Sequence, residues 1–283
     1  GELDYDTCLD LLSDPVNLKY NSREARFRIA LTMIEADADS FARDFHARRF
    51  KRPSERIKLA FLAAQKAPEA VAYSIRRFKI PSVETRYKLA LAIAKKPKTF
   101  DIPLQDFDIK GFKLPKVQQR FEIALLLAKR AGLMFGDVIK EYDLPSAMHF
   151  EIAMAAARYN GPGDSIRGFN IPDEQQRFEI AQARLKNEMG AGIVKSPESF
   201  ASFNLNKEHS AALIGMAVEA KLPVYTLLNP KNVPDDNTRA EWAKRQAHLF
   251  GTQVSSRILE IEIPKKADRF EIAKAAYEEA VEP

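Results

Sequence analysis

The feature that most constrains the fold is a short motif that recurs along the whole chain. The letters RFEIA stand at residues 120–124, 177–181 and 269–273, and HFEIA stands at residues 149–153. Weaker forms extend the motif to nine anchor positions, separated by 28 to 34 residues. The anchors are Arg26, Arg56, Arg86, Arg120, His149, Arg177, His209, Arg239 and Arg269. A period of this length is typical of solenoids, in which each unit buries its apolar face against its neighbours.

Each anchor begins an amphipathic helix, which we name helix A. The fourth residue after the anchor is alanine in eight of the nine units, with Leu213 as the exception. Apolar residues also fall one, three, seven and eight positions after the anchor, as Phe121, Ile123, Leu127 and Ala128 illustrate. This spacing defines one face of a helix with 3.6 residues per turn. The small alanine indicates that a second backbone approaches closely at that position.

A shorter helix, which we name helix B, is expected between successive helices A, and a proline turn ends it. The turns read FKIP at 78–81, FKLP at 112–115, YDLP at 142–145 and FNIP at 169–172. Serine or aspartate often follows the proline, as in Ser82 and Asp235, where it can cap the next helix. The alternating segment ILEIEI at 258–263 is interpreted as a helix end that runs into Pro264.

These patterns predict an all-α protein, a right-handed α-solenoid of about nine antiparallel helix pairs. It forms a single helical-repeat domain over residues 1–283, without a sheet. The positions one, three and four residues after each anchor should be buried throughout. Ser210 and Ala240 replace the usual aromatic residue, so we expect a local irregularity there. Because the chain opens on a lone helix B and closes on a lone helix A, we expect it to be a fragment of a longer protein. We also expect it to be a monomer.

Composition places the chain among soluble globular proteins. The 283 residues are 46% hydrophobic, and no apolar run approaches the roughly 18 residues that a transmembrane helix needs. The first residues are acidic and lack the apolar stretch of a signal peptide. Cys8 is the one cysteine, so no internal disulfide forms, which fits a reducing compartment. We therefore expect a cytoplasmic protein without a transmembrane segment.

The anchor arginine lies among apolar positions in the first turns of helix A, where the helix dipole opposes a cation. We predict that its guanidinium binds carbonyls at the end of a neighbouring helix B, or an acid such as Glu84 or Asp268. Arg86, Arg120 and Arg177 should then be largely buried. The alternative is a row of arginines that lines a groove for an anionic ligand. The nine anchors are interpreted as a structural inter-repeat ladder, because histidine replaces arginine at two of them.

Charge is unevenly distributed along the sequence. The net charge is +5, yet residues 22–98 hold 19 basic against 8 acidic side chains, a balance of 19 − 8 = +11. Two clusters occupy the same phase of adjacent units, ARRFKR at 47–52 and RRFK at 76–79. We name their cations the basic edge: Arg48, Arg49, Lys51, Arg52, Arg76, Arg77 and Lys79. Such a surface attracts an acidic protein, an anionic membrane or a nucleic acid, although it also suits a solvated face.

Motifs for catalysis are absent from the sequence. No nucleotide-binding fingerprint, kinase set or nucleophile elbow is found. The four histidines lack the spacing of a two-histidine metal site, and one cysteine cannot build a zinc quartet. We therefore predict that the protein is not an enzyme and that it has no catalytic residue, bound metal or cofactor.

The unit F-x-I-P followed by R-F-E-I-A resembles the repeat arrays of large effector proteins of intracellular bacteria such as Legionella. It departs from tetratricopeptide and ankyrin repeats in period and signature. The resemblance implies secretion into a host cell and action on host proteins there, and it assigns no functional residue.

The predicted function is a non-catalytic helical-repeat scaffold that binds another protein, with the basic edge facing an acidic partner. Two alternatives stay open. One is nucleic-acid binding through the basic N-terminal repeats, and the other is a regulatory or substrate-docking domain of a larger enzyme.

Overall fold

The computed structural model describes residues 4–13, 22–96, 107–159, 165–191 and 202–281, and every regular element in these ranges is helical. The all-α prediction is therefore confirmed for the described residues, and the alternating segment at 258–263 begins as a helix. The chain divides into two compact units, which are described separately. Unit 1 comprises Gly1–Arg130 with Val138–Pro145, and unit 2 comprises Ala131–Asp137 with Ser146–Pro283. One continuous domain stays a prediction.

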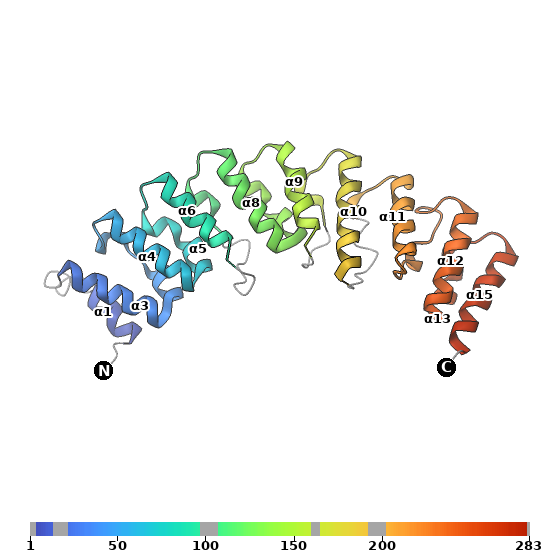
Figure 1. Cartoon of the computed structure of the whole chain (residues 1–283), viewed down its shortest axis with the longest axis horizontal. Helices are drawn as coiled ribbons and strands as arrows, with labels where there is room; N and C mark the ends of the chain where they lie inside the picture. The colour runs from blue at the N-terminus through green and yellow to red at the C-terminus, as the bar shows by residue number, and fades with distance from the viewer. Residues whose placement is uncertain (1–3, 14–21, 97–106, 160–164, 192–201, 282–283) are drawn as a thin grey trace. The chain divides into compact units, whose positions relative to one another are not determined.

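In unit 1, helices A and B alternate along the chain (Figure 1). Helices A are α3, α4, α6 and α8, and neighbours α3, α4 and α6 lie side by side. A kink at Asp37 divides α3, and the segment after the kink stands at the helix B position. Helices B are α1, η1, α5, α7 and η4, some of which are short 3₁₀ turns. The bounds are α1 (Tyr5–Ser13), α3 (Arg23–Asp44), η1 (Ala47–Arg49), α4 (Pro53–Lys66), α5 (Pro68–Phe78), α6 (Val83–Ala94), α7 (Ile109–Phe112), α8 (Val117–Ala131) and η4 (Ile139–Tyr142).

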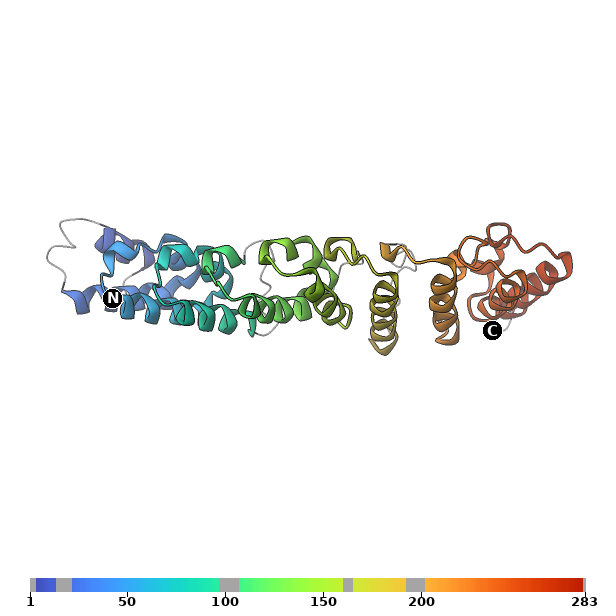
Figure 2. The same ribbon diagram turned by 90° about the horizontal axis from the view of Figure 1, so that it is seen from above.

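In unit 2, helices A are α9, α10, α11, α12 and α15, and each contacts the next. Shorter elements connect them, and Figure 2 shows both units from above. The bounds are η3 (Gly132–Asp137), α9 (Ser146–Ala157), η5 (Arg167–Phe169), α10 (Glu174–Ala191), α11 (Lys207–Glu219), η7 (Tyr225–Leu227), α12 (Asp236–Phe250), α13 (Thr252–Ser255), α14 (Ile258–Ile261) and α15 (Lys266–Val281).

The starts of helices A follow from local sequence. Pro53 occupies the first turn of α4, where its missing N–H would have no partner in any case. The Ser82 hydroxyl accepts a hydrogen bond of 3.2 Å from the Thr85 backbone N–H and caps α6. The Asp235 carboxylate accepts one of 2.6 Å from the Thr238 backbone N–H and caps α12. The residues after the turn therefore set where each helix A begins.

Burial follows the predicted face only in part. The alanine four residues after the anchor is fully buried in most units, and Ala60, Ala90 and Ala124 have no exposed area. The prediction that the position after the anchor is buried throughout is wrong, because Phe27 and Tyr87 are half-buried and Phe270 is 67% exposed. In α15, Ala273 is exposed too. Phe27 and Tyr87 contact the following helix A, where Lys58 lies over the Phe27 ring and Glu122 accepts from the Tyr87 hydroxyl, so their burial depends on what that helix supplies.

A left-handed residue ends most helices B. In each case an aromatic or aliphatic residue precedes it and an aliphatic residue follows it. These residues have φ between 46° and 53°, a region that side chains with a Cβ rarely adopt. They are Lys79, Lys113, Asp143, Asn170, Asn204 and Glu262. The left-handed residue ends helix B, and the proline turn that follows leads to the next helix A.

Replacing Lys113 with glycine should raise the free energy of unfolding by about 0.5–1 kcal/mol, because glycine adopts the left-handed conformation without a Cβ penalty. Lys113→Val should lower it by about 1 kcal/mol or more, since a β-branched side chain is least compatible with positive φ. Lys129→Gly, inside α8, is the matched control and should cost about 1 kcal/mol. Urea denaturation of the four proteins measures these differences. An equal loss for both glycine variants would contradict the strain at residue 113.

Candidate functional site

The anchor arginines bind backbone carbonyls in a recurring arrangement, which we name the arginine clamp. Arg86 donates from Nε to the Phe112 carbonyl at 2.6 Å and from Nη2 to the Lys113 carbonyl at 3.3 Å. Its Nη1 donates to the Ile80 and Pro81 carbonyls at 2.7 and 2.8 Å. The same four-carbonyl pattern is found at Arg56, Arg120, Arg177 and Arg239.

Two clamps meet on one turn. In FKLP at 112–115, Arg86 binds the first two carbonyls and Arg120 binds those of Leu114 and Pro115 at 2.8 and 3.1 Å. The C-terminal carbonyls of a helix lack intrahelical partners and carry partial negative charge. Two cations at the end of helix B therefore satisfy these carbonyls, and the attraction offsets the cost of an arginine near the start of helix A.

Three anchors make fewer bonds to carbonyls of the described residues. His149 makes one such bond there, between its Nδ1 and the Phe169 carbonyl at 2.9 Å. Arg269 binds the Ile263 and Pro264 carbonyls at 2.6 and 2.9 Å but reaches no second turn in the described residues. His209 turns instead to a carboxylate, and Arg26 is half-buried. Arg239 is 2% exposed, and the Arg120 side chain is 14% exposed, so it is largely buried as predicted. Arg86 and Arg177 are of intermediate burial.

Arg239→Ala should lower the free energy of unfolding by about 3 kcal/mol or more, because it leaves four carbonyls of unit 2 without their donor. Arg269→Ala is the matched control and should cost about half as much, because Arg269 holds two carbonyls. Arg239→Lys should recover little, since an ammonium cannot reach four oxygens in a fixed fork. Equal losses for the two alanine variants, measured by thermal and urea unfolding, would contradict the clamp as the source of stability.

Two members of the basic edge have partners within the chain. Arg76 forms a salt bridge to Asp108 at 2.7 Å, and this partner raises the pKa of Arg76 above its usual range. Arg49 donates to the Ser13 hydroxyl at 2.9 Å, and burial lowers the pKa of Arg49 while the nearby Asp44 opposes that change. Both side chains are therefore committed to contacts inside unit 1.

The other five members are exposed and form no ion pair with a described residue: Arg48, Lys51, Arg52, Arg77 and Lys79. The two sequence clusters are joined through one clamp. Arg56 donates to the Lys51 carbonyl at 3.0 Å and to the Lys79 carbonyl at 3.3 Å. A single guanidinium thus holds the backbone of both clusters, so their side chains emerge from one edge of unit 1.

His46 is a member of this surface that the sequence patterns did not indicate. Burial lowers its pKa from 6.5, the positive charges of Arg49, Arg77 and Arg48 lower it further, and Asp44 opposes them. Arg77 comes from the second cluster, so the two clusters act on the same imidazole. The only available sequence signal was the position of His46 just before ARR. The imidazole is therefore an internal probe of the potential at the basic edge.

We predict that His46 titrates below pH 6.5 in the folded chain and that Arg77→Gln raises its pKa, because one cation is removed. Since the folded state then binds fewer protons than the unfolded state, this group makes stability fall as the pH drops through 6.5 toward the folded pKa. Occupation of the edge by an anion should raise the pKa. Histidine-ring NMR titration tests this, with Lys88→Gln as the control. An unchanged His46 pKa in Arg77→Gln would contradict the proximity.

Other chemistry and the comparisons add no site. No group of three or more histidine, cysteine, aspartate or glutamate side chains in the described ranges could hold a metal ion. None of the helices that the structure describes has the length and hydropathy needed to traverse a bilayer. No protein-family model matches the chain, and neither does a curated protein or a solved structure. The function is therefore inferred from the molecule's own geometry.

Proposed function

We propose that the chain is a helical-repeat scaffold, a right-handed α-solenoid of about nine helix pairs, that binds another protein through the basic edge of unit 1. Support for the solenoid comes from the clamp, which recurs with the same carbonyl pattern in both units. A device that links each helix pair to the next is what a stacked array requires. The clamp also fixes the backbone beneath the basic edge.

The single observation that carries the binding proposal is the set of five exposed cations of the basic edge. Arg48 and Arg77 come from adjacent repeats and both act on His46, so their charges add over a small area. A concentrated positive surface raises the rate at which an acidic partner associates and favours it over other partners. The partner is accordingly a protein with an acidic surface. A role as a bacterial effector that acts on host proteins rests on the sequence resemblance alone.

Nucleic acid is the second candidate, because phosphates are attracted by the same cations. The aromatic residues within the clusters do not favour it. Phe50 is 3% exposed and Phe78 is fully buried, so neither can stack on a base. Tyr73 is exposed on α5, but its ring receives a cation–π contact from Arg43 at 5.7 Å. The basic edge thus supplies charge without a free stacking platform.

The test is a paired charge reversal. Arg48→Glu with Arg77→Glu should abolish capture of acidic proteins from a nuclease-treated lysate, read by quantitative mass spectrometry. The control, Lys95→Glu with Lys129→Glu, changes the net charge equally at the far ends of α6 and α8 and should retain every partner. Circular dichroism checks that both variants fold. Retention of all partners by the edge variant would show that the basic edge is only a solvated face.

A titration with single-stranded RNA at several salt concentrations separates the second candidate. RNA affinity that falls with a log–log slope of about −0.7 for each neutralised phosphate, and that exceeds the affinity for any captured protein, would favour nucleic acid.

A further inference from the structure

The repeat anchored at His209 departs from the others at both positions that the clamp and the core use. Histidine replaces arginine, and Ser210 stands where most units carry an aromatic residue. As in the repeat that contains η5, helix B here is a single 3₁₀ turn, η7. The two substitutions coincide in one segment of unit 2, and together they remove both a clamp and an aromatic ring from its packing.

The His209 side chain faces the preceding helix, α10, and not the turn that follows its own repeat. Its Nδ1 lies 2.7 Å from the Glu174 carboxylate, and its ring stacks on Phe178 with centroids 4.2 Å apart. Glu174 also accepts a hydrogen bond from the Asn206 backbone N–H at 2.9 Å, and this bond, followed by His209, lowers the pKa of Glu174. The imidazole therefore makes no clamp to the turn that follows η7.

Asparagine side chains hold that turn in place of a guanidinium. The Asn232 amide donates to the Leu227 carbonyl at 3.2 Å. The Asn229 side-chain oxygen accepts from the backbone N–H groups of Lys231 and Asn232, both at 3.1 Å. The turn is thus ordered without the bulk of an arginine.

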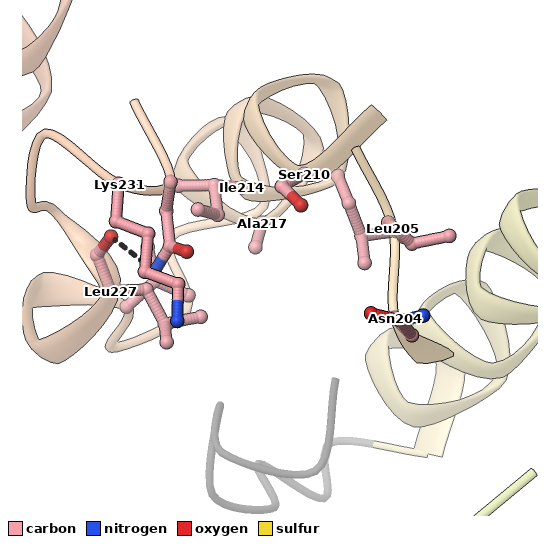
Figure 3. Close-up of a pocket in the computed structure, with 10 residues that line it drawn as sticks. Asn204, Leu205, Ser210, Ile214, Ala217, Leu227 and Lys231 are labelled. Atoms are coloured by element: carbon pink, nitrogen blue, oxygen red, sulfur yellow. Dashed lines mark hydrogen bonds between the residues drawn. The ribbon is translucent and has the colours of Figure 1, made fainter. Parts of the chain in front are cut away.

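The missing groups leave a cavity of about 180 Å³ (Figure 3). Its walls are largely apolar, with Leu213, Ile214 and Ala217 contributed by α11 and Leu227 by η7. Ser210 also lines the cavity, so a large side chain there would occupy part of the space. Ligand sites commonly combine apolar walls with a few polar groups. An apolar cavity of about 150 Å³ is known to accept benzene, so this one admits a group the size of a ring.

The polar rim indicates the charge of the ligand. Lys231 lines the cavity and is exposed, and it forms no ion pair with a described residue. In Figure 3 its side chain lies beside Leu227. The other polar lining residues among those that the structure describes are the amides Asn204 and Asn232 and the hydroxyl of Ser210, all neutral donors. None of the described lining residues is acidic, so the described rim favours an anion.

We propose that this cavity of unit 2 binds a ring-sized apolar group that carries a carboxylate. The ring lies among Leu213, Ile214 and Leu227, and the carboxylate pairs with the Lys231 ammonium. The backbone of Asn204 at the rim is fixed, because its carbonyl accepts from Arg177 at 3.1 Å. The same chemistry occurs in a free aromatic carboxylate and in a peptide that ends in phenylalanine.

The probe is 3-phenylpropionate, titrated into the full chain by isothermal calorimetry and ligand-observed NMR. We expect saturable binding that Lys231→Met weakens about fivefold to tenfold, whereas Lys207→Met, an exposed lysine outside the cavity lining, leaves it unchanged. The neutral 3-phenylpropanol should bind correspondingly less tightly than the acid. Equal binding of the acid and the alcohol would overturn the carboxylate assignment, and absence of binding by the acid would overturn the site.

Ser210→Phe restores the residue type common at this position and should abolish binding by filling the cavity. Intermolecular NOEs from the ring protons to the methyl groups of Leu213 and Ile214 locate the ligand without any substitution, so the test holds even if that variant does not fold. Binding without these NOEs would place the ligand elsewhere and overturn the proposal. A tripeptide, acetyl-Gly-Gly-Phe with a free carboxylate, is compared with the free acid. Whichever binds more tightly identifies the source of the ligand.

Discussion

The hydrogen bonds from one guanidinium to carbonyls of two successive turns are the interaction on which the regular part of the structure depends. A helix B of one or two turns has more orphan carbonyls than intrahelical bonds, so alone it is unstable. Arginine supplies five donors in a rigid fork and keeps its charge at any physiological pH. Arg86 and Arg120 both bind the turn that ends α7, so this helix B is held by guanidinium groups of two successive helices A. The clamp replaces helix length as the source of order.

Because the bonds that recur in every complete clamp go to backbone oxygens, they place few demands on the side chains of the turn, although Arg120 also pairs with the Asp143 carboxylate at 3.5 Å. The left-handed position is exposed and carries lysine at 79 and 113, aspartate at 143 and glutamate at 262. The same backbone geometry thus presents different charges in different repeats. The basic edge arises where lysine and arginine gather at this level of adjacent repeats, and the clamp of Arg56 fixes their spacing.

The repeat at His209 illustrates the consequence of losing the clamp. The imidazole pairs with Glu174, asparagines tie the next turn, and space opens beside Ser210. Arg269 illustrates a second form of incompleteness, since its Nε and Nη2 reach no carbonyl of a described residue. Phe270 and Tyr277 on the same helix are 67% and 68% exposed. In these two repeats, an incomplete clamp is accompanied by a cavity or by exposed aromatic side chains.

The sequence by itself determined the helical class, the period and the positions of the proline turns, because apolar spacing and capping residues act locally. It also indicated carbonyls as partners for the anchor arginines. Only the tertiary structure decided which cations of the basic edge are free, since Asp108, the partner of Arg76, lies 32 residues away in sequence. It likewise decided the lowered pKa of His46 and the cavity beside Ser210. Such features depend on distances between segments far apart in the chain, which no local pattern encodes.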